Sequence, residues 1–166
     1  MGDIKIRSLD DNDKEWLKRL IISEWASINV VTRGKVHYID KLPGYVAIQE
    51  SEKVGLITFS ISKDECEIIT LNSLKENLGI GTALLEELEN FATSKGCKRL
   101  WVITTNDNTD ALRFYQMKGF RIKTIYTDAI KESRKLKPEI ALRGLNDIEI
   151  RDEIELEKIL KKKRNS

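Results

Sequence analysis

The 166-residue chain has few of the side chains that bind metals or form disulfides, with only two cysteines and one histidine. Cys66 and Cys97 are far from any CxxC or Cys/His spacing, so neither a zinc site nor a disulfide framework is expected. We interpret both as small buried apolar residues. Acidic residues flank Cys66 and raise the pKa of its thiol, which argues against a nucleophile. The expected environment is a reducing cytoplasm, and no metal is expected.

Long apolar runs and an excess of one charge are also absent. No run reaches the roughly 18 residues of a membrane span, and the N-terminal MGDIKIRSLDD has neither a signal-peptide core nor a myristoylation pattern. The 29 basic and 27 acidic residues leave a formal charge of +2, too balanced to indicate nucleic-acid binding. The one dense basic run, 161–164, is interpreted as a solvated terminus. We therefore expect neither a membrane nor a nucleic acid as a partner.

Repeats, low-complexity stretches and Pro/Gly/Ser linkers are absent as well. Residues 1–166 are therefore predicted to be one domain, with a core at about 3–127 and a C-terminal helix and strand extension at about 128–160. Hydrophobic spacing predicts strands at 4–6, 45–49, 54–61, 65–71, 100–104 and 120–126, and helices at 11–25, 81–94, 108–118 and 129–137. The polar segment 32–41 is predicted to be a loop.

The segment 153–157 fits two structures. Glutamates alternate with Ile154 and Leu156, which favours a strand, but these two residues also form a helical stripe with Ile159 and Leu160. We prefer the strand. With it, hairpin-linked strands come first and crossover units follow, which indicates an α/β fold with a mixed sheet covered by helices.

Two glycines stand at the point where the helix 81–94 begins. Gly79 and Gly81 follow the strand 67–71 and its loop, although glycine is a poor helix former. The first-turn amides of a helix have no intrahelical partners and attract anions, and glycine leaves them accessible. The third glycine of a dinucleotide fingerprint and the ending of a P-loop are missing. On this motif alone, a phosphate site and a plain turn are equally supported.

The next strand and helix favour the phosphate site over the plain turn. The stretch NTDALRFYQMKGF, residues 108–120, resembles the Asn-x-x-Ala-x-x-Phe-Tyr-x-x-x-Gly-Phe element of the GNAT superfamily of acyl-CoA-dependent N-acyltransferases. The glycine pair resembles the family's Arg/Gln-x-x-Gly-x-Gly/Ala element at the usual separation, except that Glu76 replaces Arg or Gln. A carboxylate beside a pyrophosphate is electrostatically unfavourable, so Glu76 is expected either to point to solvent or to have its charge offset by Lys75.

The resemblance covers residues 3–127 and implies a single-domain, mixed, mostly antiparallel sheet flanked by helices. It also implies acetyl-CoA as cosubstrate and direct attack by a primary amine of a small molecule or peptide. Tyr115 matches the tyrosine that faces the sulfur, and Glu67 is the candidate base. The residues expected to bind the cofactor are Leu71, Asn72, Ser73, Gly79, Ile80, Gly81, Thr82, Asn106 and Asn108. A homodimer is left open.

Each candidate has a structural alternative. Tyr115 fits a core tyrosine, Glu67 fits a solvated strand face shared with Glu65, and Asn108 fits a helix N-cap. Arg33, Lys35 and His37 fit either an acceptor-binding loop or a solvated one. For the whole chain, Glu76 supports the alternative of a CoA-binding sensor that performs no transfer.

Overall fold

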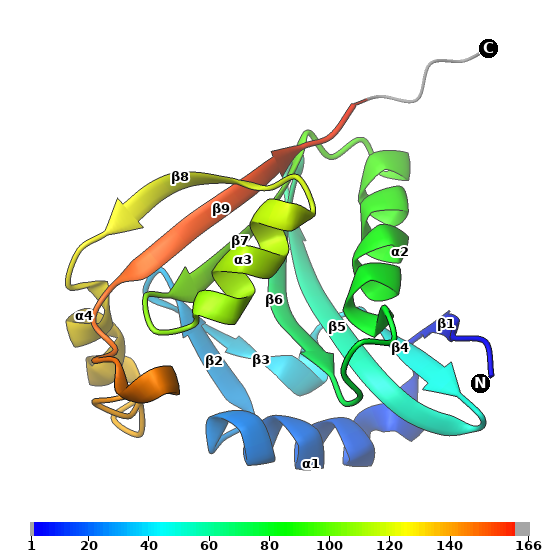
Figure 1. Cartoon of the computed structure of the whole chain (residues 1–166), viewed down its shortest axis with the longest axis horizontal. Coiled ribbons are helices and arrows are strands. Elements are labelled where there is room, and N and C mark those ends of the chain that lie inside the picture. Colours follow the sequence, from blue (N-terminus) through cyan, green and yellow to red (C-terminus); the bar gives the residue numbers. More distant parts are fainter. Residues whose placement is uncertain (1, 162–166) are drawn as a thin grey trace.

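The computed structural model describes residues 2–161, so most of the basic run at 161–164 lies outside the described residues. Seven strands form one sheet in the order β1-β4-β5-β6-β7-β9-β8, and β2 pairs with β3 in a separate hairpin (Figure 1). The strands are β1 (Lys5–Ser8), β2 (Asn29–Thr32), β3 (Lys35–Tyr38), β4 (Gly44–Gln49), β5 (Glu52–Ser62), β6 (Glu65–Ser73), β7 (Arg99–Thr105), β8 (Arg121–Tyr126) and β9 (Glu153–Ile159). The helices are α1 (Lys14–Trp25), α2 (Ile80–Ser94), α3 (Thr109–Met117) and α4 (Ala129–Leu136).

The sheet is mixed and mostly antiparallel, as predicted. Only β6 and β7 run parallel, and every other neighbouring pair is antiparallel. The segment 153–159 is a strand, as preferred over a helix, and it lies between β7 and β8 rather than at an edge. Four of its seven residues are buried, including Ile154 and Leu156. β9 therefore completes the core and holds β8 in the sheet.

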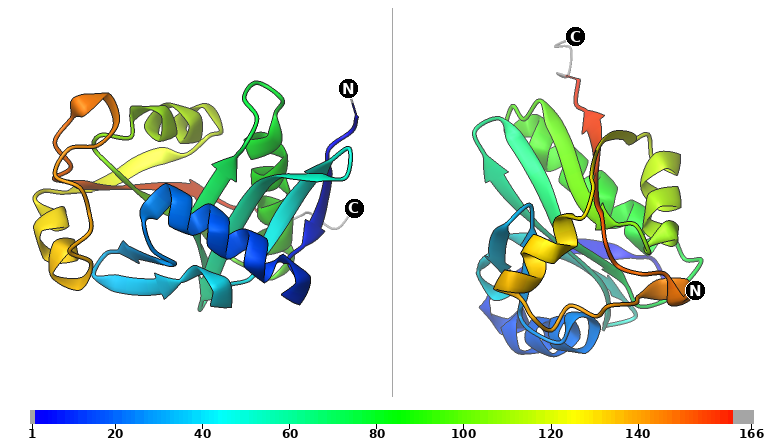
Figure 2. Two further views of the ribbon diagram at one scale, coloured as in Figure 1. Left: turned by 90° about the horizontal axis from the view of Figure 1, so that it is seen from below. Right: turned by 90° about the vertical axis from the view of Figure 1, so that its left-hand side faces the viewer.

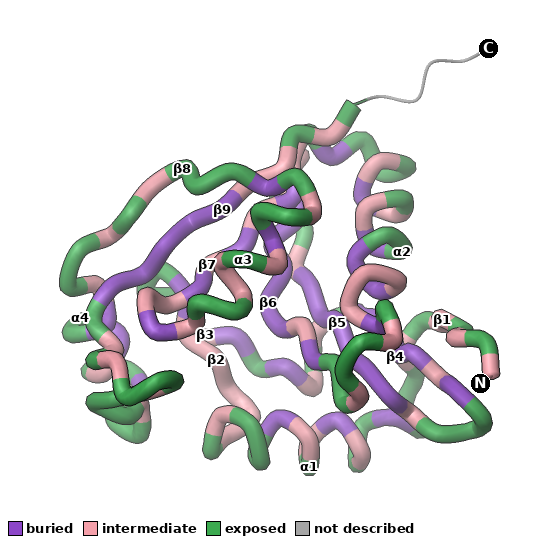
Figure 3. Tube along the Cα trace, viewed as in Figure 1, coloured by how far each residue is buried: buried purple, intermediate pink, exposed green. Residues whose placement is uncertain are grey.

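Two hydrophobic clusters cover opposite faces of the sheet (Figures 1 and 2). On one face, α2 and α3 pack over Phe59, Ile68 and Val102. On the other face, α1 packs over Leu56 and Ile69, and the β2–β3 hairpin lies beside it. Burial is concentrated along β5, β6 and β9 between these layers (Figure 3). Among residues 2–161, no helix has the length and apolar character needed to cross a membrane.

The prediction of a loop at 32–41 was wrong. Thr32 ends β2 and β3 begins at Lys35, so these two residues pair across a two-residue turn. The turn residues Arg33 and Gly34 both have positive φ, at 49° and 74°, which matches the twist of a tight hairpin. A 3₁₀ helix, Ile39–Lys41, follows. The polar sequence suggested a solvated loop, but the side chains of Thr32 and His37 are buried and hydrogen-bonded to each other.

Candidate active site

The centre of the candidate site is the point where β6 and β7 separate. Their parallel register runs from Glu65 and Arg99 to Ile68 and Val102 and then stops. β6 continues to Ser73, paired only with β5, while β7 continues to Thr105, paired only with β9. The backbone of β6 beyond Ile68 therefore has one edge free of a neighbouring strand, and such an edge can pair with an extended ligand.

A β-bulge at Ile69 sets which residues face each side of this gap. Phe59 pairs with Ile68 but Thr58 pairs with Thr70, so Ile69 is one extra residue on β6. The bulge shifts the alternation, and Ile69 packs in the cluster beneath α1.

The predicted cofactor residues on β6 consequently divide between the two faces. Leu71 packs in the cluster under α2, and the hydroxyl of Ser73 donates to the carbonyl of Lys75. Asn72 is buried opposite Leu56 on the α1 side, and its Oδ1 has no hydrogen-bond donor among the described residues. The free backbone edge of this segment thus remains available to a ligand, whereas the amide oxygen of Asn72 is unpaired but buried.

The start of α2 has the properties of an anion site. Gly79 precedes the helix with φ 72° and ψ 18°, and no side chain caps the helix. The first bond back to Gly79 comes from the amide of Ala83, so the amides of Ile80, Gly81 and Thr82 are unpaired within the helix. A side chain at Gly79 would meet open space, which leaves these amides accessible. Ile80 contributes through its backbone alone, because its side chain is buried against Gly55.

Glu76 is exposed ahead of this helix start. The expectation that Lys75 offsets its charge is not supported by the ion pair in the structure, because the Lys75 Nζ lies 3.4 Å from a carboxylate oxygen of Glu52. Exposure to water screens the Glu76 charge instead.

Glu67 projects from β6 onto the face opposite α2, where the hairpin covers it. The interpretation of a solvated strand-face carboxylate was wrong for this residue, because Glu67 is only 7% exposed. The hydroxyl of Thr32 donates to Glu67 Oε1 at 2.8 Å, and the Nε2 of His37 lies 3.8 Å from Oε2. Burial raises the pKa of Glu67 to about 7, despite the Thr32 hydrogen bond and Lys35, which lower it. A carboxyl with this pKa can act as a base near neutral pH.

Glu65 shares this face but differs in its surroundings. It is half-buried and lies 3.1 Å from the guanidinium of Arg99, which also bonds Glu155 and Glu157 of β9. Glu65 is thus the ion-paired carboxylate of the two, and Glu67 is the one without a cationic partner in contact.

Beside Arg33 at the hairpin tip lie Glu153, Glu155 and Tyr126, which the sequence did not mark as site residues. Arg33 donates to the Glu153 carboxylate from both its backbone and its side chain, and its guanidinium lies 3.4 Å above the Tyr126 ring. The Tyr126 hydroxyl donates to Glu155 at 3.0 Å. The alternation of glutamates in 153–157 was the available signal, since it places three carboxylates on one strand face. Arg33 is therefore engaged with the fold rather than free in a loop.

Tyr115 lies on the other face of the sheet, on α3. It is 5% exposed and its ring packs edge-on against Phe114 and Phe120 at centroid distances of 5.2 Å. Its hydroxyl has no hydrogen-bond partner within residues 2–161, and burial raises its pKa, so it stays protonated. The packing of a core tyrosine and an available phenolic donor are thus combined in one residue.

The two asparagines after β7 have structural roles. The Asn108 Oδ1 accepts from the Ala111 amide at 3.1 Å and caps α3, as the alternative predicted. The side chain of Asn106 bonds Glu149, Arg151 and Asp152, which ties the loop after β7 to the segment before β9. The side-chain amide of Asn106 is thereby occupied, and its backbone N–H donates to the carbonyl of Asp152 at 3.2 Å.

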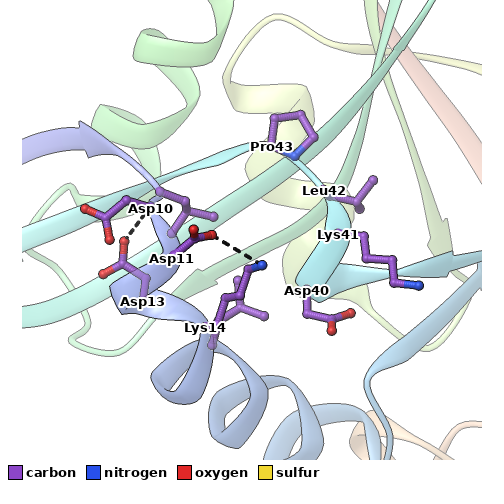
Figure 4. A pocket seen from close by; sticks show the side chains of 10 residues that line it. Asp10, Asp11, Asp13, Lys14, Asp40, Lys41, Leu42 and Pro43 are labelled. Atoms are coloured by element: carbon purple, nitrogen blue, oxygen red, sulfur yellow. Dashed lines mark hydrogen bonds and ion pairs between the residues drawn. The ribbon is translucent and has the colours of Figure 1, made fainter.

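Other groups lie outside this site. Cys66 and Cys97 are buried and free, and burial raises the pKa of Cys66 to about 12, so it is not a nucleophile. No group of three or more His, Cys, Asp or Glu side chains in the described part of the chain is placed to hold a metal. A hollow of about 440 Å³ lies between the start of α1 and the segment before β4 (Figure 4). Its buried acid, Asp13, is bonded to Arg7 and Lys53 and is therefore not free to act as a base.

A mixed sheet with one separating parallel pair, beside an uncapped glycine helix start, defines an α/β protein in which a free strand edge and unpaired helix amides are accessible. A sequence profile of the acetyltransferase (GNAT) family matches residues 12–120. The chain belongs to this family.

One curated relative and two solved structures are similar to this chain over most of its length. The uncharacterized protein YxbD of Bacillus subtilis is 42% identical over 148 residues, which cover 89% of this chain and 93% of that protein. The structure of the IAA acetyltransferase of Bacillus cereus has a TM-score of 0.71 at 23% identity, covering 95% of this chain and all of that one. A GNAT family acetyltransferase of Elizabethkingia anophelis with acetyl-CoA bound has a TM-score of 0.70 at 23% identity, covering 96% of this chain and 100% of that one. The two structures establish a shared fold.

Proposed function

We propose that the protein transfers the acetyl group of acetyl-CoA to the nitrogen of a primary amine by direct attack. The observation that carries the proposal is the buried Glu67, which lies on β6 one residue before the last pair with β7 and has a raised pKa, while Tyr115 is buried in the cluster on the opposite face of the sheet. An acyl donor lying in that gap would meet a base on one side and a phenolic proton donor on the other.

The residues at the gap and at α2 fit acetyl-CoA. The free edge of β6 from Ile69 to Ser73 suits an extended arm, and the amides at the start of α2 suit a pyrophosphate. Acetyl-CoA supplies an acetyl group activated as a thioester. Backbone amides of β6 would donate to the oxygen on which negative charge develops.

Glu67 acts on the acceptor. Its carboxylate removes a proton from the protonated amine, because only the neutral amine has the electron pair that attacks. As the bond from nitrogen to the acetyl carbon forms, the bond from carbon to sulfur breaks. Tyr115 donates its phenolic proton to the departing sulfur and regains a proton from the product nitrogen. The products are an amide and a free thiol, with one proton released for each protonated amine consumed.

A thiol-release assay tests the proposal. We expect acetyl-CoA-dependent thiol release with at least one member of a panel of small amines, polyamines, amino acids and peptides, and mass spectrometry should find the acetyl group on nitrogen. The activity should rise with pH through about 7, the pKa of Glu67.

A catalytically silent CoA sensor predicts a different result. Calorimetry would then register acetyl-CoA binding, while no amine in the panel would increase thiol release above hydrolysis. That outcome would contradict the transferase proposal. Acetyl transfer to a hydroxyl or thiol alone would contradict the assignment of an amine acceptor.

A further inference from the structure

The β2–β3 hairpin brings two polar side chains into contact with Glu67. Val30 pairs with His37 and Thr32 pairs with Lys35, so Thr32 and His37 are diagonal neighbours on one face of the hairpin. Both are buried, His37 with 3% of its surface exposed. The Thr32 Oγ1 lies 2.8 Å from Glu67 Oε1 and 2.8 Å from His37 Nε2. One hydroxyl thus joins the only histidine of the chain to the candidate base.

The number of available protons determines which group donates and which accepts in each of these two hydrogen bonds. A threonine hydroxyl has one hydrogen to donate, and an ionised carboxylate can only accept. When Glu67 is ionised, Thr32 must donate to Glu67 Oε1, and it can then only accept from His37. His37 must therefore carry its proton on Nε2.

The surroundings keep the ring neutral and leave one carboxylate oxygen open. Burial and the nearby Lys35 of β3 lower the pKa of His37 to about 4, so it enters the chain as neutral imidazole. Oε2 of Glu67 accepts no hydrogen bond among the described residues, although Oε1 is held by Thr32.

Charged groups on neighbouring strands act on Glu67 in both directions. Lys35 of β3 lowers its pKa, whereas Glu153 and Glu155 of β9 raise it. Arg99 of β7 is bonded to Glu65, Glu155 and Glu157 and makes no contact with Glu67. Among the described side chains, Thr32 is the one that donates a hydrogen bond to the Glu67 carboxylate, and this bond stabilises the ionised form.

We propose that Thr32 and His37 are positioning residues that act through Glu67. In this arrangement the chain from His37 Nε2–H through the Thr32 hydroxyl to Oε1 holds the carboxylate in place, with Oε2 free to take the proton of the acceptor amine. The catalytic meaning of this inference rests on the proposed function, whereas the hydrogen-bond chain itself does not.

The first test uses the single histidine as a reporter and needs no turnover. In protein labelled with ¹⁵N-histidine, we expect NMR at about pH 8 to find the proton of His37 on Nε2. The His37 nitrogen shifts should also change with a midpoint near 7, where Glu67 titrates rather than His37. Thr32→Val should abolish this response. A proton on Nδ1 at about pH 8, or shifts that do not respond to pH near 7, would overturn the proposal even in an inactive protein.

The second test separates positioning from stability. Thr32→Val keeps the side-chain shape but removes the hydroxyl. In the pH profile of kcat, the apparent pKa of the acidic limb should rise by about one unit, and the KM for acetyl-CoA should not change. Thr32→Ser should restore the wild-type limb. Thr58→Val is the matched control, because it removes a buried hydroxyl of β5 that bonds only Thr70, and it should leave the limb unchanged. An unshifted limb in a folded Thr32→Val variant, or equal shifts in both valine variants, would contradict the proposal.

Discussion

At the scale of single residues, the burial of Glu67 gives it a pKa suited to a base but lowers the free energy of unfolding at high pH. A folded-state pKa of about 7, against the ordinary 4.5, means that the folded chain holds the proton more tightly than the unfolded chain. The contribution to stability is therefore fully present below about pH 4.5 and is lost as the pH rises through 7. A shift of this size corresponds to roughly 3 kcal/mol of lost stability in the alkaline range.

Glu67→Gln should accordingly lose activity and gain stability. The amide cannot take the amine proton, so we expect kcat to fall by roughly 10²–10⁴-fold. Its melting temperature at pH 8 should rise by about 6–12 °C, with no rise at pH 4, where Glu67 is already neutral. Glu65→Gln is the control from the same strand face, and it should not increase stability at pH 8, because Glu65 is paired with Arg99. Equal melting temperatures for wild type and Glu67→Gln at pH 8 would contradict the burial cost.

Tyr115→Phe tests the other side of the gap. The ring contacts with Phe114 and Phe120 are kept and only the hydroxyl is removed, so the fold should persist. We expect kcat to fall by about 10–100-fold with little change in the KM for acetyl-CoA, since water can replace part of the proton donation. Steady-state kinetics on an accepted amine measure both constants. A wild-type kcat with reduced thermal stability would mean that Tyr115 has a packing role and no catalytic role.

At the scale of elements, the start of α2 separates two roles of glycine. Gly79 has a positive φ that other residues adopt with strain, so it forms the turn into the helix. Gly81 is in the helix proper, and a Cβ there would lie 3.5 Å from the Phe114 ring, an ordinary contact. Gly81 is therefore a site where a side chain can be added without breaking the fold.

Gly81→Val should weaken acetyl-CoA binding at least tenfold while circular dichroism remains that of wild type. The branched side chain would crowd the amides available to a phosphate, yet valine is no worse a helix former than glycine. Calorimetry gives the affinity. Gly81→Ala is the graded control and should lose less. Unchanged affinity in the valine variant would contradict a phosphate site at the start of α2 and favour a plain turn.

The helices and strands differ in how well the sequence predicts them. Long periodic segments such as α2, and the Asn108-to-Phe120 pattern on α3, were correctly predicted because hydrophobic spacing and capping are local signals. The hairpin was missed because Thr32 and His37 are polar, and only their contact with Glu67 explains their burial. Glu67 itself was named as a base, but its burial depends on that same hairpin, which is close only in the folded chain.

At the scale of the whole molecule, β9 carries the second half of the sheet. It pairs with β7 and β8 along its length, and Leu156 on it is fully buried. Leu156→Ala should lower the free energy of unfolding by about 2–5 kcal/mol, measured by urea denaturation. Ile159→Ala in the same strand is the control, because Ile159 is 65% exposed and its loss should cost less than about 0.5 kcal/mol. Similar losses in both variants would contradict the central position of β9.

The position of β9 has a consequence for synthesis on the ribosome. β8 pairs with no strand of the sheet except β9, and β9 is translated after it, across the intervening α4 segment. The nascent chain can assemble β1, β4, β5 and β6 early, but it must hold β8 unpaired until residues 153–159 emerge. An unpaired strand is a template for association with other chains. A nascent chain that pauses between β8 and β9 therefore exposes an unpaired strand that can associate with other chains.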